Sequence, residues 1–235
     1  MTRRYLIVDD NKAFAENLAE ILSDEGSEVT VAAAGADALE LVAHIRFDAL
    51  VTDMRMPVMG GAQLVHEIRQ IDPDLPAIVV TAYTNEEDLV AARHEGLLAI
   101  LPKPVPIERL TELLLQARRG GLVVLVDDDV ALADNLAEIL RTRGFSAVSA
   151  HSVAETERLG PVTPFVALAD LRMPGGSDGD AVRMLGLRFP GLPILVVTAH
   201  GESRCLKKPL PTFEKPFDSA ALLRTVEGLY DRSLS

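Results

Sequence analysis

The chain has 235 residues, 48% of them hydrophobic, which is enough for one large domain or two domains of ordinary size. Its formal net charge of -12 and its low aromatic content of 4%, with no tryptophan, disfavour nucleic acid as a partner. No apolar run is long enough to span a membrane, the first residues do not resemble a signal peptide, and a single cysteine, Cys205, excludes an internal disulfide. We therefore expect a cytoplasmic protein without a membrane partner.

The sequence contains a long internal repeat. LIVDDNKAFAENLAEILSDEG at residues 6–26 returns as VLVDDDVALADNLAEILRTRG at 124–144, VTDMRMP at 51–57 as LADLRMP at 168–174, and LPAIVVTA at 75–82 as LPILVVTA at 192–199. A repeat of this length indicates a duplicated domain, with a first domain at 1–119, a Gly-Gly linker at 120–121 and a second domain at 122–235. Two glycines cannot form a long tether, so the domains should lie close together, in packing that the sequence leaves either fixed or hinged.

Strand-like and helical segments alternate through the first half. Apolar runs predict strands near 4–8, 28–32, 47–53, 77–81 and 98–102. Apolar residues at helical spacing, such as Phe14, Leu18 and Leu22, predict helices near 12–25, 36–45, 61–70, 86–95 and 106–118. This alternation predicts a parallel sheet with helices on both faces.

The second half follows the same scheme as far as Thr198 and then departs from it. In the first half 22 positions separate Thr81 from Lys103, whereas 17 separate Thr198 from Lys215. The missing positions come from the fourth helix, and the remaining segment, 200–211, has two prolines and no apolar face. We expect a loop or a single turn there.

Polar residues follow the strands of the first half at the points where those strands end. Asp9 and Asp10 follow the first strand, Asp53 ends the third, Thr81 ends the fourth and Lys103 follows the fifth. Ligand sites of open α/β sheets lie at this edge, and three carboxylates gathered there favour a hard cation such as Mg²⁺. A carboxylate can also act as a nucleophile towards phosphorus, with an ammonium and a hydroxyl stabilising the transferred group.

This ordered set resembles the receiver domain of response regulators, the phosphate-accepting module of two-component signalling. Each half carries an acid pair, an Asp in a D-x-x-M-P turn, a Thr-Ala pair and a Lys-Pro pair. The resemblance implies two flavodoxin-like, doubly wound five-stranded parallel sheets in tandem, each with strand order 2-1-3-4-5, the second with a degenerate fourth helix.

The resemblance also implies a role for each residue. Asp53 would accept phosphate from a histidine kinase or a His-phosphotransfer protein, Thr81 and Lys103 would contact the phosphoryl group, and Asp9 would act through water. Asp10, Asp53 and the carbonyl of Arg55 would bind one Mg²⁺, with Mn²⁺ as the alternative ion. The matching residues of the second half are Asp127, Asp128, Asp170, Arg172 through its carbonyl, Thr198 and Lys215.

The sequence departs from the family pattern in two places. The aromatic residue that the family often carries three positions before the lysine is replaced by Ile100 and Thr212. Two Lys-Pro pairs, at Lys208 and Lys215, compete in the second half, and we prefer Lys215 because the last predicted helix follows it. The five histidines, His151 among them, lack ligand spacing and are interpreted as surface or boundary residues.

We therefore expect a phosphorelay protein whose output is a contact with a downstream protein target, with no catalysis beyond self-phosphorylation and slow self-dephosphorylation. A homodimer would form through the first half, which keeps its fourth helix. One alternative is that the second half is a docking scaffold that is not phosphorylated. Another is a phosphohydrolase of small molecules, which is disfavoured because neither half carries a substrate-binding insertion.

Overall fold

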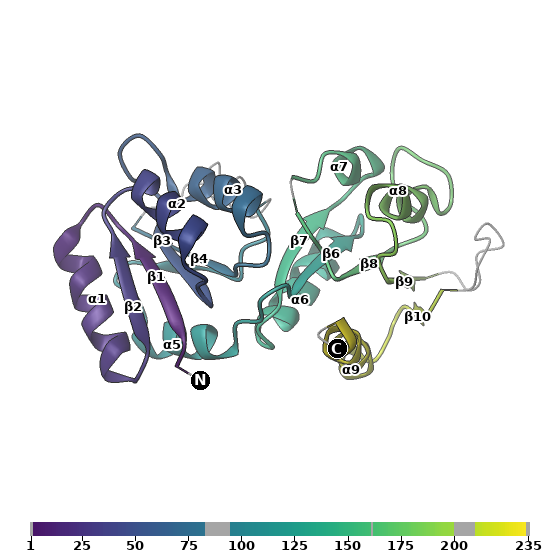
Figure 1. Cartoon of the computed structure of the whole chain (residues 1–235). Coiled ribbons are helices and arrows are strands. Elements are labelled where there is room, and N and C mark those ends of the chain that lie inside the picture. The colour runs from purple at the N-terminus through teal and green to yellow at the C-terminus, as the bar shows by residue number, and fades with distance from the viewer. Residues whose placement is uncertain (1, 83–94, 161, 200–209, 234–235) are drawn as a thin grey trace.

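The structure, a computed structural model, describes residues 2–82, 95–160, 162–199 and 210–233 (Figure 1). The described chain forms two halves, each built on a five-stranded parallel sheet with helices on both faces. Within these residues, no helix is both long enough and apolar enough to cross a membrane.

The sheet of the first half has the strand order β2-β1-β3-β4-β5. Its strands are β1 (Arg4–Val8), β2 (Glu28–Ala32), β3 (Ala49–Asp53), β4 (Ala77–Thr81) and β5 (Ala99–Pro102). Its described helices are α1 (Lys12–Asp24), α2 (Gly35–His44), α3 (Gly61–Ile71) and α5 (Ile107–Gln116).

Successive residues of β1 face opposite sides of this sheet. Tyr5 and Ile7 pack with α1 and α5, whereas Leu6 and Val8 pack with α2 and α3. All four side chains are buried. A strand that is covered on both faces must be apolar throughout, which is why β1 reads as a continuous hydrophobic run.

The sheet of the second half has the same topology, with the order β10-β9-β8-β6-β7. Its strands are β6 (Leu122–Val126), β7 (Ser146–Ala150), β8 (Val166–Ala169), β9 (Ile194–Thr198) and β10 (Thr212–Glu214). Its described helices are α6 (Val130–Arg141), α7 (Val153–Glu157), α8 (Asp180–Arg188) and α9 (Ser219–Ser233). The predicted pair of doubly wound sheets is therefore confirmed.

Two of the predicted segments cannot be compared with the structure. The helix predicted near 86–95 and the loop predicted at 200–211 lie almost wholly outside the described residues. The second half also differs from the first where no difference is predicted, because α7 has 5 residues and its counterpart α2 has 10.

Helix α5 ends at Gln116, so the prediction that it reaches residue 118 is wrong. The cause lies in the second half. Gly144, with φ of +79°, lies so close to this helix end that a Cβ at position 144 would overlap the Gln116 carbonyl oxygen. The N–H of Arg118 donates to the Gly144 carbonyl at 3.0 Å, so the chain has left the helix there.

The chain that follows α5 is bonded to the first half. The guanidinium of Arg119 donates to both carboxylate oxygens of Asp72 at 2.6 and 2.7 Å, and the N–H of Gly120 donates to the carbonyl of Asp74 at 2.9 Å. Asp72 caps the end of α3, the helix that follows Asp53. These bonds fix the direction in which the chain leaves the first half.

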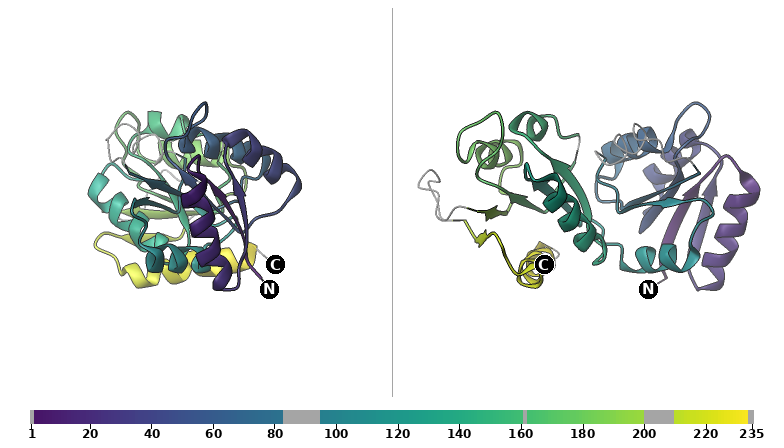
Figure 2. Two further views of the ribbon diagram at one scale, coloured as in Figure 1. Left: turned by 90° about the vertical axis from the view of Figure 1, so that its left-hand side faces the viewer. Right: turned by 180° about the vertical axis from the view of Figure 1, so that it is seen from behind.

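The same stretch, which connects the two halves in Figure 2, is also bonded to the second half. The hydroxyl of Tyr230, on α9, donates to the carbonyl of Arg119 at 2.7 Å. The guanidinium of Arg118 donates to the carbonyl of Arg143 at 2.9 Å and lies 4.7 Å from the ring centre of Phe145. The connection is therefore a bonded joint between the halves.

Candidate functional site

The polar residues of the first half converge at the carboxyl edge of its sheet because their strands are neighbours. Asp9 follows β1 and Asp53 ends β3, and these two strands pair directly. Asp53 pairs with Val80 of β4, so Thr81 lies one position further along that strand. The N–H of Lys103 donates to the carbonyl of Thr81 at 2.7 Å, which places Lys103 beside Thr81.

One ammonium joins the two buried carboxylates of the first half. Lys103 Nζ lies 2.6 Å from Asp9 Oδ2 and 2.6 Å from Asp53 Oδ1. The remaining oxygens accept backbone hydrogen bonds, from the N–H of Asn11 to Asp9 and from the N–H of Arg55 to Asp53. The structure thus brings three of the predicted residues into direct contact.

The second half repeats this arrangement. Lys215 Nζ lies 2.7 Å from Asp127 Oδ2 and 2.7 Å from Asp170 Oδ2. The N–H of Asp129 donates to Asp127 Oδ1, and the N–H of Arg172 donates to Asp170 Oδ1. The N–H of Lys215 donates to the carbonyl of Thr198 at 2.8 Å, which places Lys215 beside Thr198 as Lys103 lies beside Thr81. The competing Lys208 lies outside the described residues.

The two lysines remain charged in these surroundings. Burial lowers the pKa of Lys103, but its hydrogen bonds to Asp53 and Asp9 outweigh burial, and the net pKa is raised above the ordinary value. Burial acts in the same way on Lys215, and the bonds to Asp127 and Asp170 again raise its pKa overall. Each site therefore holds a fixed positive charge between two carboxylates.

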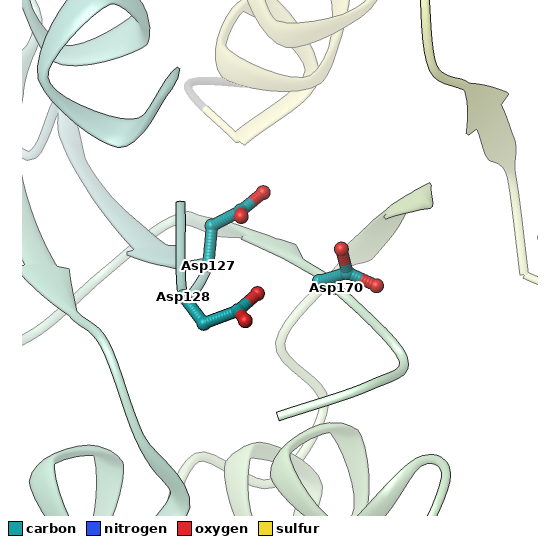
Figure 3. Close-up of side chains that lie close together, drawn as sticks. All are labelled: Asp127, Asp128 and Asp170. Carbon is teal, nitrogen blue, oxygen red and sulfur yellow. The ribbon is translucent and has the colours of Figure 1, made fainter. Parts of the chain in front are cut away.

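The third carboxylate distinguishes the two sites. Asp127, Asp128 and Asp170 each present an oxygen, and these oxygens all lie within 4.8 Å of one another (Figure 3). Within the described residues this is the only group of acidic, His or Cys side chains with such spacing, so Asp9, Asp10 and Asp53 do not form one. Asp10 and Asp128 are both exposed.

In each half, the residue after the acid pair caps the helix that follows, α1 or α6. The side chain of Asn11 accepts a hydrogen bond from the N–H of Phe14, which caps α1. In the second half Asp129 accepts from the N–H of Leu132 and caps α6. A side-chain cap of this kind fixes the start of a helix, and here it also fixes the strand end directly before it.

The loop after Asp53 folds back on itself. The N–H of Gly61 donates to the carbonyl of Met54 at 2.9 Å, and a Cβ at Gly61 would overlap the Asp53 carbonyl oxygen. Only glycine lets α3 begin this close to the site. At the far end of the loop Val58 has φ of +70° and is fully exposed.

Two neighbours of the sites are not among the predicted site residues. The ring of Phe14 lies with its centre 4.4 Å from Lys103 Nζ, although the sequence places Phe14 on the apolar face of a helix. His151 Nδ1 lies 2.9 Å from the carbonyl oxygen of Asp127. No spacing rule signals either contact, because each joins segments that are far apart in sequence.

Comparison with known proteins agrees with this architecture. The family described as "Response regulator receiver domain" matches residues 5–115 and again residues 123–227. A response regulator receiver protein of Anaeromyxobacter sp. (strain Fw109-5) is 61% identical over 231 residues, which are 97% of this chain and 95% of that protein. The response regulator MprA of Mycobacterium ulcerans (strain Agy99) is 39% identical over 137 residues, and the match spans 57% of its length.

Solved structures match one half of the chain at a time. The crystal structure of a response regulator receiver protein from Pseudomonas putida has a TM-score of 0.47 at 30% identity and covers 49% of this chain and 96% of its own. The receiver domain of the sensor histidine kinase PA1611 from Pseudomonas aeruginosa PAO1 has a TM-score of 0.45 at 28% identity, with 48% and 95% covered. On the two family matches and the similarity along its whole length, this chain belongs to the response regulator receiver domain family and carries two receiver domains in tandem.

Proposed function

We propose that both receivers accept phosphate, on Asp53 in the first and on Asp170 in the second, from a histidine kinase or a His-phosphotransfer protein. The observation that carries this proposal is the repeated arrangement of one lysine between two buried carboxylates. We place the domain boundaries at 1–119 and 122–235, with Gly120 and Gly121 between them.

The transfer would proceed by attack of a carboxylate oxygen on phosphorus. The bond from phosphorus to the donor imidazole breaks, and its electron pair leaves with the nitrogen. Lys103 or Lys215 would move from its carboxylates to an oxygen of the phosphoryl group, and Thr81 or Thr198 would donate its hydroxyl to another. Hydrolysis of the product would be slow self-dephosphorylation.

The donor set fits a magnesium ion, because it consists of carboxylate and carbonyl oxygens at the end of parallel strands. In the second receiver Asp128, Asp170 and the Arg172 carbonyl would hold the ion, with Asp127 acting through water. In the first receiver Asp10, Asp53 and the Arg55 carbonyl would do so, with Asp9 acting through water. When bound, Mg²⁺, or Mn²⁺ in its place, supplies positive charge to the phosphoryl oxygens.

The second receiver is better interpreted as a working acceptor than as a scaffold. Its half-buried lysine forms the same pair of ion contacts with two buried carboxylates as in the first, and oxygens of its three acids lie within 4.8 Å of one another. Output would be a contact with a downstream protein. Receiver domains are typically signalling modules, and we propose no turnover of small substrates.

Exposure to acetyl phosphate tests this proposal. The intact mass of the wild type should increase by two phosphoryl groups in the presence of Mg²⁺, and EDTA should prevent both additions. Hydroxylamine should remove them, as expected of acyl phosphates. An unmodified mass with Mg²⁺ present would contradict the proposal.

A further inference from the structure

We infer that His151 is a positioning residue of the second receiver, which orients Asp127 and Asp128 for a divalent cation and makes this site the tighter of the two. The inference rests on the proposed function, since it concerns the same metal site. His151 would act through the backbone of the acid pair, without itself touching the metal.

The contact is a hydrogen bond to the peptide that joins the two acids. His151 Nδ1 lies 2.9 Å from the Asp127 carbonyl oxygen. A carbonyl oxygen only accepts, so Nδ1 must carry the proton. The carbonyl of Asp127 belongs to the planar peptide unit that leads to Asp128. Fixing that plane holds the Cα of Asp128, from which its side chain extends.

The backbone of His151 is itself held by the start of α7. The backbone N–H of His151 donates to Glu155 Oε2 at 2.8 Å, and the backbone N–H of Glu155 donates to the side chain of Ser152, which caps α7. The N–H of Asp127 donates to the carbonyl of Ala150 at 3.1 Å. The backbone of Asp127 is thus bonded on both sides to the end of β7.

The first receiver has only one of the two hydrogen bonds that hold the backbone of Asp127 in the second. The N–H of Asp9 donates to the carbonyl of Ala32 at 3.2 Å, as in the second receiver. The position that matches His151 is Ala33, however, whose methyl group cannot donate a hydrogen bond.

The receiver that has the histidine is also the one whose three carboxylates lie close together. The three carboxylates of the second receiver lie close together (Figure 3), each with an oxygen within 4.8 Å of the others. Among the residues that the structure describes, the carboxylates of the first receiver form no such group. The position of the lysine cannot explain this difference in carboxylate spacing, because both sites place an ammonium between two carboxylates at nearly equal distances.

A second difference is that the lysine ammonium of the first site has an aromatic contact that the matching position of the second half cannot provide. Lys103 Nζ lies 4.4 Å from the ring centre of Phe14, a cation–π contact, while the matching position in the second half is Leu132. An ammonium that is held against the carboxylates competes with a divalent cation for their oxygens. Both differences therefore favour the second site for the cation.

Calorimetric titration of the full chain with Mg²⁺ tests the inference. Asp10→Asn would leave the second site to be measured alone, and Asp128→Asn would leave the first. In the Asp10→Asn protein, we expect His151→Phe to weaken Mg²⁺ binding at the second site about tenfold, as loss of an outer-shell partner typically does. Phenylalanine keeps a ring but has no N–H donor. His151→Asn, which keeps an N–H donor, should restore most of that affinity.

The outcomes are distinct. The inference stands if the second site binds Mg²⁺ more tightly than the first, His151→Phe weakens it and His151→Asn does not. It is overturned if His151→Phe binds as the wild type does, if His151→Asn is as weak as His151→Phe, or if the two sites have equal affinity. If neither site binds Mg²⁺ in the wild type, the proposed function fails instead. Circular dichroism of each variant without metal checks that the fold is kept.

Discussion

Lys215 and Asp170 are in direct contact, with Nζ 2.7 Å from Oδ2, and the same nitrogen lies 2.7 Å from Asp127. The carboxylate that we propose as the phosphate acceptor is therefore already paired with a cation in the unphosphorylated protein. The pairing is buried, since the Asp170 and Asp127 side chains are 9% and 6% exposed. Lys103 has the same relationship to Asp53 and Asp9.

Replacing this lysine should destabilise the protein without metal and tighten its binding of Mg²⁺. In Lys215→Met two buried carboxylates lose their counter-charge, which costs about 3 kcal/mol of unfolding free energy when one partner of a buried pair is removed. Mg²⁺ no longer competes with an ammonium there, so its affinity should rise. Urea unfolding with and without Mg²⁺, together with calorimetry, measures both effects.

Lys12→Met is the control, because Lys12 and its partner Glu16 are largely exposed and their pair should contribute little. Weaker Mg²⁺ binding by Lys215→Met would show that the lysine does not compete with the cation.

Substituting Gly144 should damage the joint between the receivers. Gly144 and Gly26 occupy matching positions of the repeat, and both have positive φ, +79° and +90°. The added methyl group of Gly26→Ala would meet nothing within 4 Å, so this variant should lose only about 1–2 kcal/mol of unfolding free energy, the cost of a left-handed alanine. The methyl group of Gly144→Ala would also overlap the Gln116 carbonyl oxygen, so this variant should lose clearly more unfolding free energy. Equal losses in chemical denaturation would contradict the packing described for α5.

Replacing Val58 with glycine should stabilise the first receiver. Val58 has φ of +70°, and the N–H of Met59 donates to the carbonyl of Pro57 at 2.8 Å, so Val58 is the central residue of a strained γ-turn. Its side chain is fully exposed and makes no contribution to the core. Relief of the left-handed strain should exceed the added entropy of glycine in the unfolded chain, for a gain of about 0.5–1 kcal/mol.

Thermal and urea unfolding measure this gain. Val130→Gly is a matched comparison, because Val130 is also exposed but is the first residue of helix α6 and has no positive φ, so glycine relieves no strain there and should not stabilise the protein. A loss of stability in Val58→Gly would mean that the turn is not strained.

The bond between Tyr230 and the linker should give the protein an alkaline dependence of stability. Burial raises the pKa of the Tyr230 phenol above its ordinary value of 10.0. Above pH 10 the unfolded chain therefore loses this proton while the folded chain keeps it, so stability falls as the pH rises. Below pH 9 the wild type should be more stable than Tyr230→Phe by about 1 kcal/mol, the usual contribution of one hydrogen bond.

That advantage should shrink as the pH rises through 10 towards the pKa of the folded phenol. Tyr5, whose pKa burial also raises, is present in both proteins and cancels in the comparison. A difference that stays constant from pH 8 to pH 11 would show that the Tyr230 phenol does not have a raised pKa in the folded protein.

Sequence patterns predicted most of the framework because that framework follows from local rules. The apolar run before Asp9 is a strand buried on both faces, and Leu18 and Leu22 are buried at helical spacing in α1. Strands predicted at 47–53 and 98–102 begin later, at Ala49 and Ala99, without a change of register or order.

The features that were not predicted depend on contacts between distant segments. Helix α5 ends at Gln116 because Gly144 of the other receiver packs there, and nothing near residue 116 signals it. The bond from His151 to the Asp127 carbonyl joins two loops of the second receiver. A positive φ at Val58 is equally unpredictable, because valine is a poor residue for that conformation.

Asp53 and Asp170 are the two proposed phosphate acceptors, and removing each carboxylate in turn tests that assignment. The wild type, Asp53→Ala, Asp170→Ala and the double variant are treated with acetyl phosphate and Mg²⁺, and the intact mass of each is measured. We expect two added phosphoryl groups on the wild type, one on each single variant and none on the double variant. Phosphate that persists on the double variant, or a wild type that takes up none, would contradict the assignment.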